Sequence, residues 1–586
     1  MSRLDNTLVH LAPGVTTCRD LGGHYNPRKG LAIYCLPIPG YSPASPGVVL
    51  GEALAARSGL GCTLLDGIPA KIPEGAVVVG QYSAIKALRP ELLDDVPELR
   101  EQGQYSIRLG RYALVTSPSR EGLASGMQTL AMLVLRHNED RLPGSVIMDN
   151  PRCRGRCLAV ELASGEIGVN LLMQIASFAA TFKANRLHLI LDEDFDPSRD
   201  IPGVETFAQT CQSFGIGLGV RLRLLRPLLS GNKTIIEAWA AVRAAARAFG
   251  ATHAALDDPC PEGADPDMCE RIVSSMAKGE VGLPHFSVDA RLISRSGIPP
   301  AELKAAGITG WHRLWERSDA PPPEFEDIPL IIDVQSPVPG FSSRTTSGFH
   351  HRLDAAVRHL RRQNRRELMI SFRDIGISHM WQNLMYPAAT GLITAWGEPN
   401  VAEDSAWRFS NLLYGDSAKM IMAMWEHIAA AFPPGLSEAE EKLVRRTAFG
   451  RWPEADEDFR VLSGVDWLAV TKNIKSAAES LKTAAAGLSR NAATLAGAKL
   501  SLYALSWLHC FVALMPELER RRQEGYDGDA RTEPIANELA NNFRAWHSHL
   551  QEAYAESGLE FCEMPEVESM GLRLQGLCEG IFEYGE

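Results

Sequence analysis

The sequence of 586 residues lacks the features that mark several common classes of protein. Its 59 lysines and arginines are outnumbered by 71 acidic residues, which gives a net charge of −12. Proteins that bind nucleic acids need a basic surface, so we expect no nucleic-acid partner. There is no run of about 18 apolar residues, so we expect no segment that spans a membrane. The first residues, MSRLDNTLVHLAPG, also lack the basic and apolar regions of a signal peptide.

Several chemical motifs are missing as well. The sequence has no glycine-rich phosphate loop and no Gly-x-Ser-x-Gly elbow, which disfavours nucleotide-binding and serine-hydrolase classes. Cys153 and Cys157 lie four residues apart, but no second pair completes a zinc-like spacing, so we predict no metal site. The eleven cysteines are odd in number and scattered. This pattern suits reduced thiols better than a disulfide framework, so we expect a cytoplasmic location.

The chain divides into three segments that differ in their pattern of predicted strands and helices. Residues 1–150 alternate short strands and helices, with a hairpin near 105–116, and predict a small α/β domain. Residues 151–400 alternate short apolar strands with amphipathic helices, which predicts a central (β/α)8 TIM barrel. Residues 401–586 contain mainly alanine-rich helical stretches and predict a C-terminal α-helical bundle.

The predicted barrel has eight strands, and the predicted bundle has an aromatic core. The strands are expected at 157–162, 186–191, 216–222, 252–256, 284–288, 309–312, 329–333 and 367–372. In the bundle, Trp507, Phe511 and Met515 recur at a spacing of four residues, which favours one buried helix face.

One stretch of the barrel carries two adjacent acids. In Thr252–Gly263, THAALDDPCPEG, a short apolar strand ends on Asp257 and Asp258, and Pro259 follows at once. Proline keeps the residue before it out of the helical region, so the strand ends in an extended turn. Barrel enzymes place their chemistry at this end of a strand. The stretch alone equally fits a polar corner between strand and loop.

Motifs in the first segment point to a known family. The stretch YSIRLGRYALVTSPSREGLASGMQTLAMLV is followed by IMDNPRCRGRCLAVEL. A strand hairpin, a Gly-x-x-x-Gly-x-Gln-Thr-Leu helix and an Asp-x-Pro-Arg junction resemble the N-terminal module of family 20 glycoside hydrolases, the β-N-acetylhexosaminidases. The matching residues are Gly122, Gly126, Gln128, Thr129, Leu130, Asp149, Pro151 and Arg152.

Three barrel stretches extend the resemblance. FKANRLHLILDED, 182–194, resembles the family's second strand, in which Lys183, Asn185 and His188 match. THAALDD resembles its fourth-strand motif His-x-Gly-Gly-Asp-Glu, with His253 in place. ISFRDIGISHMWQNLMYP resembles the eighth-strand region of some relatives, with Asp374 in place.

The resemblance implies hydrolysis of a terminal β-linked N-acetylhexosamine with retention, in which the substrate's acetamido oxygen forms an oxazoline. Asp257 would orient the acetamido N–H, and Asp258 would act as general acid and base. This chemistry needs no metal and no organic cofactor. An Asp-Asp pair in place of Asp-Glu resembles family 84 enzymes, the O-GlcNAcase relatives, which share the order of an α/β domain, a barrel and a helical bundle.

Further residues are candidates for holding a carbohydrate substrate. Each has a structural alternative: an ion pair for Glu161, hydrogen bonds inside the barrel for the histidines, a solvated loop for the acids of the second strand, and core packing for the tryptophans. The candidates are Glu161, His188, Asp192, Asp194, His253, Trp311, Trp315 and Asp374.

The chain also departs from the family 20 pattern. The arginine expected after the first strand is absent from Glu161-Leu162-Ala163-Ser164, and the third strand offers Arg221 and Arg223 in place of Pro-Gly-His. A carbohydrate-binding protein without activity, a hydrolase of a different sugar and a purely structural scaffold therefore stay open as alternatives. The oligomeric state, including a homo-oligomer, is open too.

Overall fold

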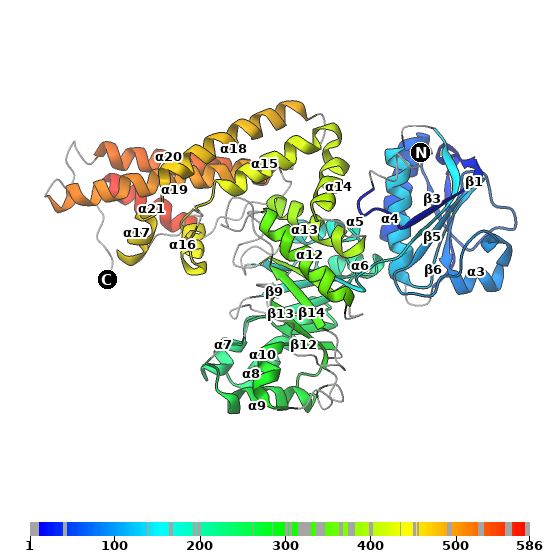
Figure 1. The fold of residues 1–586 in the computed structure, drawn as a ribbon, viewed down its shortest axis with the longest axis horizontal. Helices are drawn as coiled ribbons and strands as arrows, with labels where there is room; N and C mark the ends of the chain where they lie inside the picture. Colours follow the sequence, from blue (N-terminus) through cyan, green and yellow to red (C-terminus); the bar gives the residue numbers. More distant parts are fainter. Residues whose placement is uncertain are drawn as a thin grey trace. The chain divides into compact units, whose positions relative to one another are not determined.

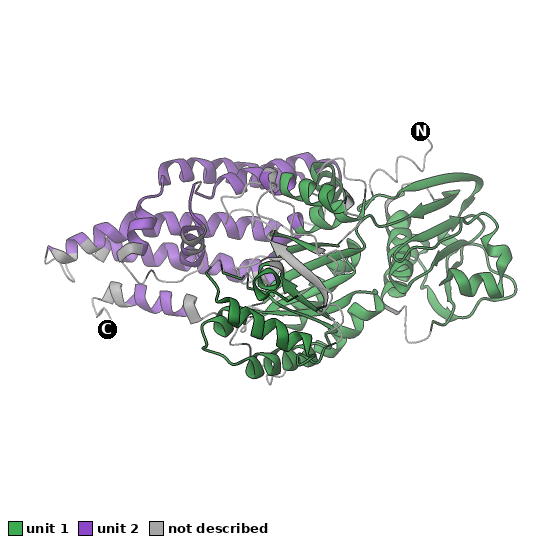
Figure 2. Cartoon of the chain, turned by 60° about the horizontal axis from the view of Figure 1, so that its bottom comes forward, with its two compact units in different colours: residues 1–335, 351–371, 388–412 green, residues 336–350, 372–387, 413–586 purple. Residues whose placement is uncertain are grey.

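The computed structural model describes most of residues 11–579. Its gaps of five or more residues are 39–43, 163–167, 196–200, 315–329, 336–345, 373–380, 489–494, 525–532 and 557–564. The chain forms two compact units (Figure 2). The first contains residues 1–335, 351–371 and 388–412, and the second contains residues 336–350, 372–387 and 413–586. The division into domains 1–150, 151–400 and 401–586 stays a prediction.

The first unit begins with a seven-stranded sheet in the order β1-β7-β5-β6-β4-β2-β3 (Figure 1). Its antiparallel pair β5–β6 confirms the predicted hairpin. Helices α2 (Ala44–Ser58) and α4 (Arg120–Arg136) contact each other and strands of the sheet. The strands are β1 (Thr17–Tyr25), β2 (Ala32–Cys35), β3 (Thr63–Asp66), β4 (Val77–Gln81), β5 (Tyr105–Leu109), β6 (Ala113–Ser117) and β7 (Leu142–Asp149).

The motif glycines of α4 allow that helix to lie directly on the sheet. A Cβ atom on Gly126 would stand 2.6 Å from Val115 Cγ1 and 3.2 Å from the Tyr105 ring. A Cβ atom on Gly122 would collide with the Ser117 hydroxyl. These family-like positions therefore serve close packing in this chain.

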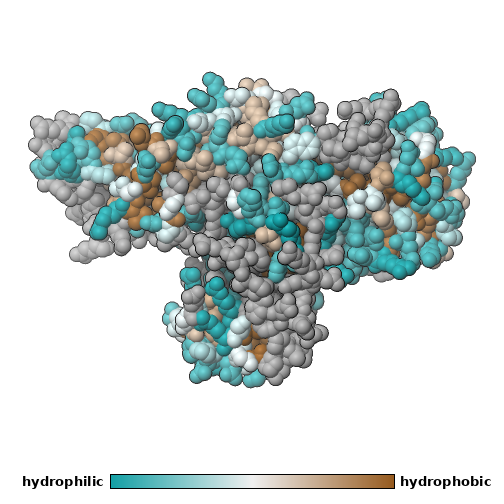
Figure 3. All heavy atoms as spheres, viewed as in Figure 1, coloured by the Kyte–Doolittle hydropathy of each residue, from teal (hydrophilic) through white to brown (hydrophobic). Residues whose placement is uncertain are grey.

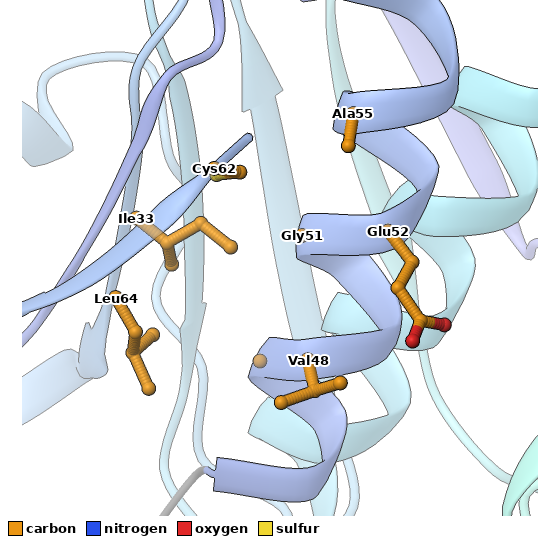
Figure 4. Close-up of a pocket in the computed structure, with 8 residues that line it drawn as sticks. Ile33, Val48, Gly51, Glu52, Ala55, Cys62 and Leu64 are labelled. Carbon is orange, nitrogen blue, oxygen red and sulfur yellow. The ribbon is translucent and has the colours of Figure 1, made fainter. Parts of the chain in front are cut away.

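The same sheet carries a small cavity at its β3 edge (Figure 4). It has a volume of about 260 Å³ and lies between α2 and strands β2 and β3. Ile33, Val48 and Leu64 make its lining mainly apolar, and Glu52 and Cys62 are its ionisable residues. It holds no cluster of acids or bases suited to catalysis.

Eight strands follow and close into a barrel in the order β8-β9-β10-β11-β12-β13-β14-β15. The described pairings between neighbours from β8 to β15 are all parallel. The eight predicted strands are confirmed, each to within two residues at either end. They are β8 (Gly155–Leu162), β9 (Arg186–Leu191), β10 (Gly217–Leu222), β11 (His253–Leu256), β12 (His285–Asp289), β13 (Ile308–Leu314), β14 (Leu330–Gln335) and β15 (Glu367–Phe372).

Helices lie between most of these strands in the sequence. The chain begins α8 with a full capping box, because the Thr234 side chain and Glu237 satisfy each other's backbone N–H groups. Residues 315–329, between β13 and β14, lie outside the described part, so a helix after every strand stays a prediction. The helices are α5 (Val169–Thr181), α6 (Val204–Ser213), α7 (Leu225–Leu229), α8 (Ile235–Ala248), α9 (Pro266–Ala277), α10 (Ala290–Ser296) and α12 (Thr346–Arg362).

The second unit consists mainly of helices, as the third segment of the sequence predicted. Trp507, Phe511 and Met515 are buried, which confirms their place in a core. The Trp507 ring lies 5.4 Å from that of Phe511 and 5.2 Å from that of Phe543. The helices that follow residue 413 are α15 (Ala418–Ala430), α16 (Glu438–Ala448), α17 (Asp456–Ser463), α18 (Trp467–Gly487), α19 (Ala496–Gln523), α20 (Glu533–Glu556) and α21 (Pro565–Glu579).

One of these helices bears on the expectation that no segment spans a membrane. The segment Ala496–Leu518 of α19 is long and apolar enough to cross a membrane, with a mean hydropathy of 1.4, although no such segment was expected. Of this stretch, 61% is buried inside the protein, and α19 contacts α20 and α18. Its apolar character is thus accounted for by a place in the helical core. A few apolar side chains still reach the surface of these helices, among polar ones (Figure 3).

Candidate active site

Asp257 and Asp258 follow directly after β11, at the carboxyl end of a barrel strand. The Asp257 N–H donates to the Leu222 carbonyl at 2.8 Å, which continues the pairing of β11 with β10 by one residue. Both side chains are nearly buried, with exposed fractions of 4% for Asp257 and 8% for Asp258. Two carboxylates removed from water at one strand end need specific partners or a proton.

Asp257 has a buried cationic partner on the neighbouring strand. Arg221 of β10 donates from Nε to Asp257 Oδ1 at 2.7 Å, and its side chain has no exposed surface. Its Nη1 donates to the Met369 sulfur at 3.6 Å, while Nη2 is buried with no hydrogen-bond partner. The ion pair therefore stabilises the ionised form of Asp257.

Asp258 accepts a hydrogen bond from the backbone, whereas Asp257 is bonded to a guanidinium. Its Oδ2 accepts a hydrogen bond from the Leu225 N–H, at the start of α7, at 3.2 Å. Burial raises the pKa of Asp258, the adjacent charge of Asp257 raises it further, and Arg223 and Arg226 offset part of the increase. Of the two acids, Asp258 is therefore the one that more readily holds a proton.

Glu161 forms an ion pair, which was one of its two predicted roles. Its carboxylate lies 2.9 Å from Arg223 Nη2, so a side chain near the end of β8 reaches one that follows β10. A sugar hydroxyl that binds Glu161 or Arg223 has to compete with the ion pair between them. Neither partner could be assigned from the sequence, because strand β9 separates them in the barrel.

Two further buried acids belong to barrel strands. Ser371 donates to Asp333 at 2.6 Å, which joins β15 to β14 inside the barrel. Asp289 accepts from the N–H groups of Arg291 and Leu292 and thereby caps α10. Burial raises the pKa of Asp289, and these backbone donors offset part of the increase. Asp289 thus caps a helix and also faces the Cys260 N–H, and Asp333 is a buried acceptor inside the barrel.

His253 and His188 lie away from the acid pair. His253 is the first residue of β11, and four residues at about 3.3 Å each separate it from Asp257. Its ring stacks on His285 at 4.6 Å, and the His188 ring lies 6.2 Å away. Burial lowers the pKa of His253 to about 4, so it is neutral at physiological pH. This geometry favours the structural role for both histidines over contact with a sugar.

The other predicted candidates cannot be placed. Asp192, Asp194, Trp315 and Asp374 lie outside the described residues. Trp311 belongs to β13, but only its backbone is described. Among the residues that the structure describes, no group of three or more His, Cys, Asp or Glu side chains could hold a metal ion.

Other family-like residues form a buried network between the sheet and the barrel. Asp149 Oδ2 accepts from Tyr105 Oη at 2.7 Å, Trp396 Nε1 at 2.8 Å and Lys183 Nζ at 3.1 Å. The Lys183 ammonium also lies 4.3 Å from the Trp396 ring. Asp149 and Lys183, which match family motifs, thus join two parts of the first unit. The role of Trp396 was not foreseen from the sequence.

Comparison with known proteins agrees with this architecture. No family model matches the chain. A curated relative, the "Beta-hexosaminidase" of Akkermansia muciniphila, is 29% identical over 174 residues, which cover 26% of this chain and 35% of the relative. The chain therefore spans about a third of the length of the curated relative it matches.

Among solved structures, that of CpGH84B covers 96% of this chain and 99% of its own, with a TM-score of 0.53 and 12% identity. The β-N-acetylhexosaminidase from Bacteroides fragilis NCTC 9343 covers 67% of this chain and 91% of its own, with a TM-score of 0.49 and 14% identity. The chain has the fold of CpGH84B, and the curated protein that it resembles in sequence is a hexosaminidase, a glycoside hydrolase.

Proposed function

We propose that this protein is an exo-acting retaining glycoside hydrolase that removes terminal β-linked N-acetylhexosamine. The site would lie at the carboxyl end of the strands of a (β/α)8 barrel. One observation carries the proposal: two adjacent buried carboxyl groups at that end have opposite electrostatic surroundings. A pair of acids of which one is protonated and the other ionised is typical of enzymes in which the two groups have separate catalytic roles.

In the first step, the acetamido carbonyl oxygen of the substrate attacks the anomeric carbon. Asp257 accepts the acetamido N–H and stabilises the positive charge that develops there. Asp258 donates its proton to the glycosidic oxygen, the bond from the anomeric carbon to this oxygen breaks, and an oxazoline forms. Asp258 is left as a carboxylate.

In the second step, Asp258 takes a proton from a water molecule. The water oxygen attacks the anomeric carbon, and the bond to the acetamido oxygen breaks. The proton taken from water restores the protonated form of Asp258, and the sugar leaves with its original configuration after two inversions at the anomeric carbon. Asp257 remains ionised throughout, because the charge on the acetamido group needs a partner in both steps.

The two states of the pair follow from contacts in the structure. Asp257 is bonded to a guanidinium, whereas Asp258 accepts from a backbone N–H and has a raised pKa. A general acid must hold its proton at the working pH, and the orienting group must not. This match between chemistry and environment supports the assignment of the two roles.

A second candidate function is a carbohydrate-binding protein without turnover, or a hydrolase of a different sugar. The ion pair of Glu161 with Arg223 favours it, since these side chains already bind each other at the barrel end. Recognition of sugar hydroxyl groups would then differ from that expected of the family 20 enzymes.

The test is turnover of 4-nitrophenyl β-glycosides of N-acetylglucosamine and N-acetylgalactosamine. We expect release of 4-nitrophenol from at least one, none from the β-glucoside that lacks the acetamido group, and inhibition by a thiazoline that mimics the oxazoline. Asp257→Asn should lower kcat/KM by roughly 100-fold or more. Asp267→Asn, at an exposed position in the first turn of α9, should leave it unchanged. Binding of the thiazoline without turnover would support the second candidate. Turnover of the β-glucoside at an equal rate would disprove the oxazoline mechanism.

We also propose a cytoplasmic location and an oligosaccharide or glycoconjugate as substrate. The described cysteines, nine in all, are free thiols. This state suits a reducing compartment.

A further inference from the structure

We infer that Arg221 is a positioning residue that holds Asp257 as a permanent carboxylate, so that Asp258 alone exchanges protons during catalysis. The inference rests on the proposed function, and it adds a residue that the family resemblance does not supply. Arg221 belongs to the third barrel strand, at a position where the sequence departs from the family 20 pattern.

The contact between Arg221 and Asp257 is buried on both sides. The side chains are 0% and 2% exposed, and Nε lies 2.7 Å from Oδ1. Residue 221 pairs across the strands with Ala255, two residues before Asp257, so the guanidinium reaches towards the strand end. An ion pair shielded from water keeps far more of its strength than an exposed pair.

The unused donor of Arg221 argues against a role in packing alone. Nη2 is buried and has no hydrogen-bond partner. A buried donor without a partner costs stability, and such a group in a native protein calls for an explanation. The Nη1 of Arg221 makes only a weak contact with the Met369 sulfur, so the bond from Nε to Asp257 is the main polar contact of the guanidinium. The cost of burying this arginine is therefore offset mainly through Asp257.

The other charged groups near the pair act mainly on Asp258 or are already engaged. Arg223, which follows β10, and Arg226 of α7 both lower the pKa of Asp258. Arg223 is also bound to Glu161 of β8. From β14, Asp333 accepts from Ser371 of β15. Arg221 makes the direct bond to Asp257 and thereby separates the states of two neighbouring acids.

These separate roles of Asp257 and Asp258 predict how the rate should depend on the leaving group. Loss of Arg221 weakens the ionised state of Asp257, which is needed for oxazoline formation whatever the leaving group. Substrates with good and poor leaving groups should therefore slow by similar factors. Loss of the general acid has a different signature, because Asp258→Asn should slow poor leaving groups far more than good ones.

The experiment compares Arg221→Lys and Arg221→Met in the full-length protein, with Arg186→Lys as a matched control. Arg186 is also an arginine of a barrel strand in an ion pair, 2.8 Å from Glu367, at the start of its strand. We expect kcat/KM to fall by roughly 10-fold for Lys and 100-fold for Met, since removal of a hydrogen-bond donor from an active site costs about 100-fold or more. In Arg221→Met, the acid limb of the pH–rate profile should move to higher pH by about one unit or more, since an opposite charge lowers a carboxyl pKa by roughly 1–3 units. Arg186→Lys should leave that profile unchanged.

A double variant keeps the test decisive if Arg221→Met folds poorly. Arg221→Met/Asp257→Asn removes both charges and should fold, and its residual activity should equal that of Asp257→Asn alone, because the two residues act as a unit. Wild-type pH dependence in Arg221→Met, or a further loss of activity in the double variant, would overturn the inference. Absence of turnover in the wild-type protein would instead contradict the proposed function, so the two failures are distinguishable.

Discussion

Replacement of Lys183 by methionine should weaken the joint between the N-terminal sheet and the barrel. The Lys183 side chain has no exposed surface, and the carboxylate that it neutralises is 1% exposed. Methionine retains most of the side-chain volume but leaves Asp149 as a buried anion without its cation. Removal of one partner from a buried ion pair typically costs about 3–5 kcal/mol. The remaining donors to Asp149, from Tyr105, Trp396 and Thr16, place the expected loss near the lower end of that range.

The assay is urea unfolding of the full-length protein, followed by circular dichroism, together with hydrogen exchange of the segments around 142–149 and 183–191. Lys278→Met serves as the control, because this lysine is exposed at the end of α9 and should change stability by no more than about 0.5 kcal/mol. The double variant Lys183→Met/Asp149→Asn should lose less than the sum of the two single variants.

The reasoning would be refuted if Lys183→Met unfolded within about 1 kcal/mol of the wild type. It would also be refuted if hydrogen exchange increased evenly over the chain, because the network predicts a local effect. In either case Asp149 would be stabilised sufficiently by its neutral donors, and the family-like lysine would need a different explanation.

Three further outcomes are expected. Asp258→Asn should lower turnover sharply yet raise the melting temperature near neutral pH. The pKa of Asp258 is raised in the folded state, so the protonated form is favoured there and stability falls as pH rises through that pKa. Burial lowers the His253 pKa from 6.5 to about 4, so the wild type loses folding stability as pH falls between these values, and His253→Phe should lose less. A wild-type melting temperature that does not change from pH 6.5 to 4 would contradict this. Gly126→Ala should cost roughly 1–3 kcal/mol in denaturant unfolding because its Cβ would stand 2.6 Å from Val115, whereas Gly61→Ala, with nothing within 4 Å, should be close to neutral.

The strand positions of the barrel could be predicted because each strand is a short apolar run bounded by polar or glycine residues. The position of Asp257 and Asp258 at a strand end follows from the same pattern. That His253 would lie far from them could also have been deduced, since four residues of extended chain span about 13 Å. A match of motif spacing does not imply that all residues of the motif meet in one site.

The pairs of the site could not be predicted. Arg221 and Asp257 lie 36 residues apart, and Glu161 and Arg223 come from strands that are not neighbours. Their contacts depend on the register and tilt of the strands, which apolar periodicity does not encode. For the same reason α19 resembles a membrane helix in composition, although its burial depends on partners such as α20, which lie elsewhere in the chain.

The contacts of Trp396 have a consequence for the way the barrel is joined to the rest of the chain. Its side chain donates to Asp149, 247 residues earlier, and its carbonyl accepts from the Arg152 N–H at 3.0 Å. The Cys153 N–H likewise donates to the Ala395 carbonyl at 2.9 Å. The entry and exit of the barrel are thus held side by side, as in a domain inserted into a host protein. A short peptide that links residues 396 and 152 should therefore close this stretch into a ring without separating the first and last barrel strands.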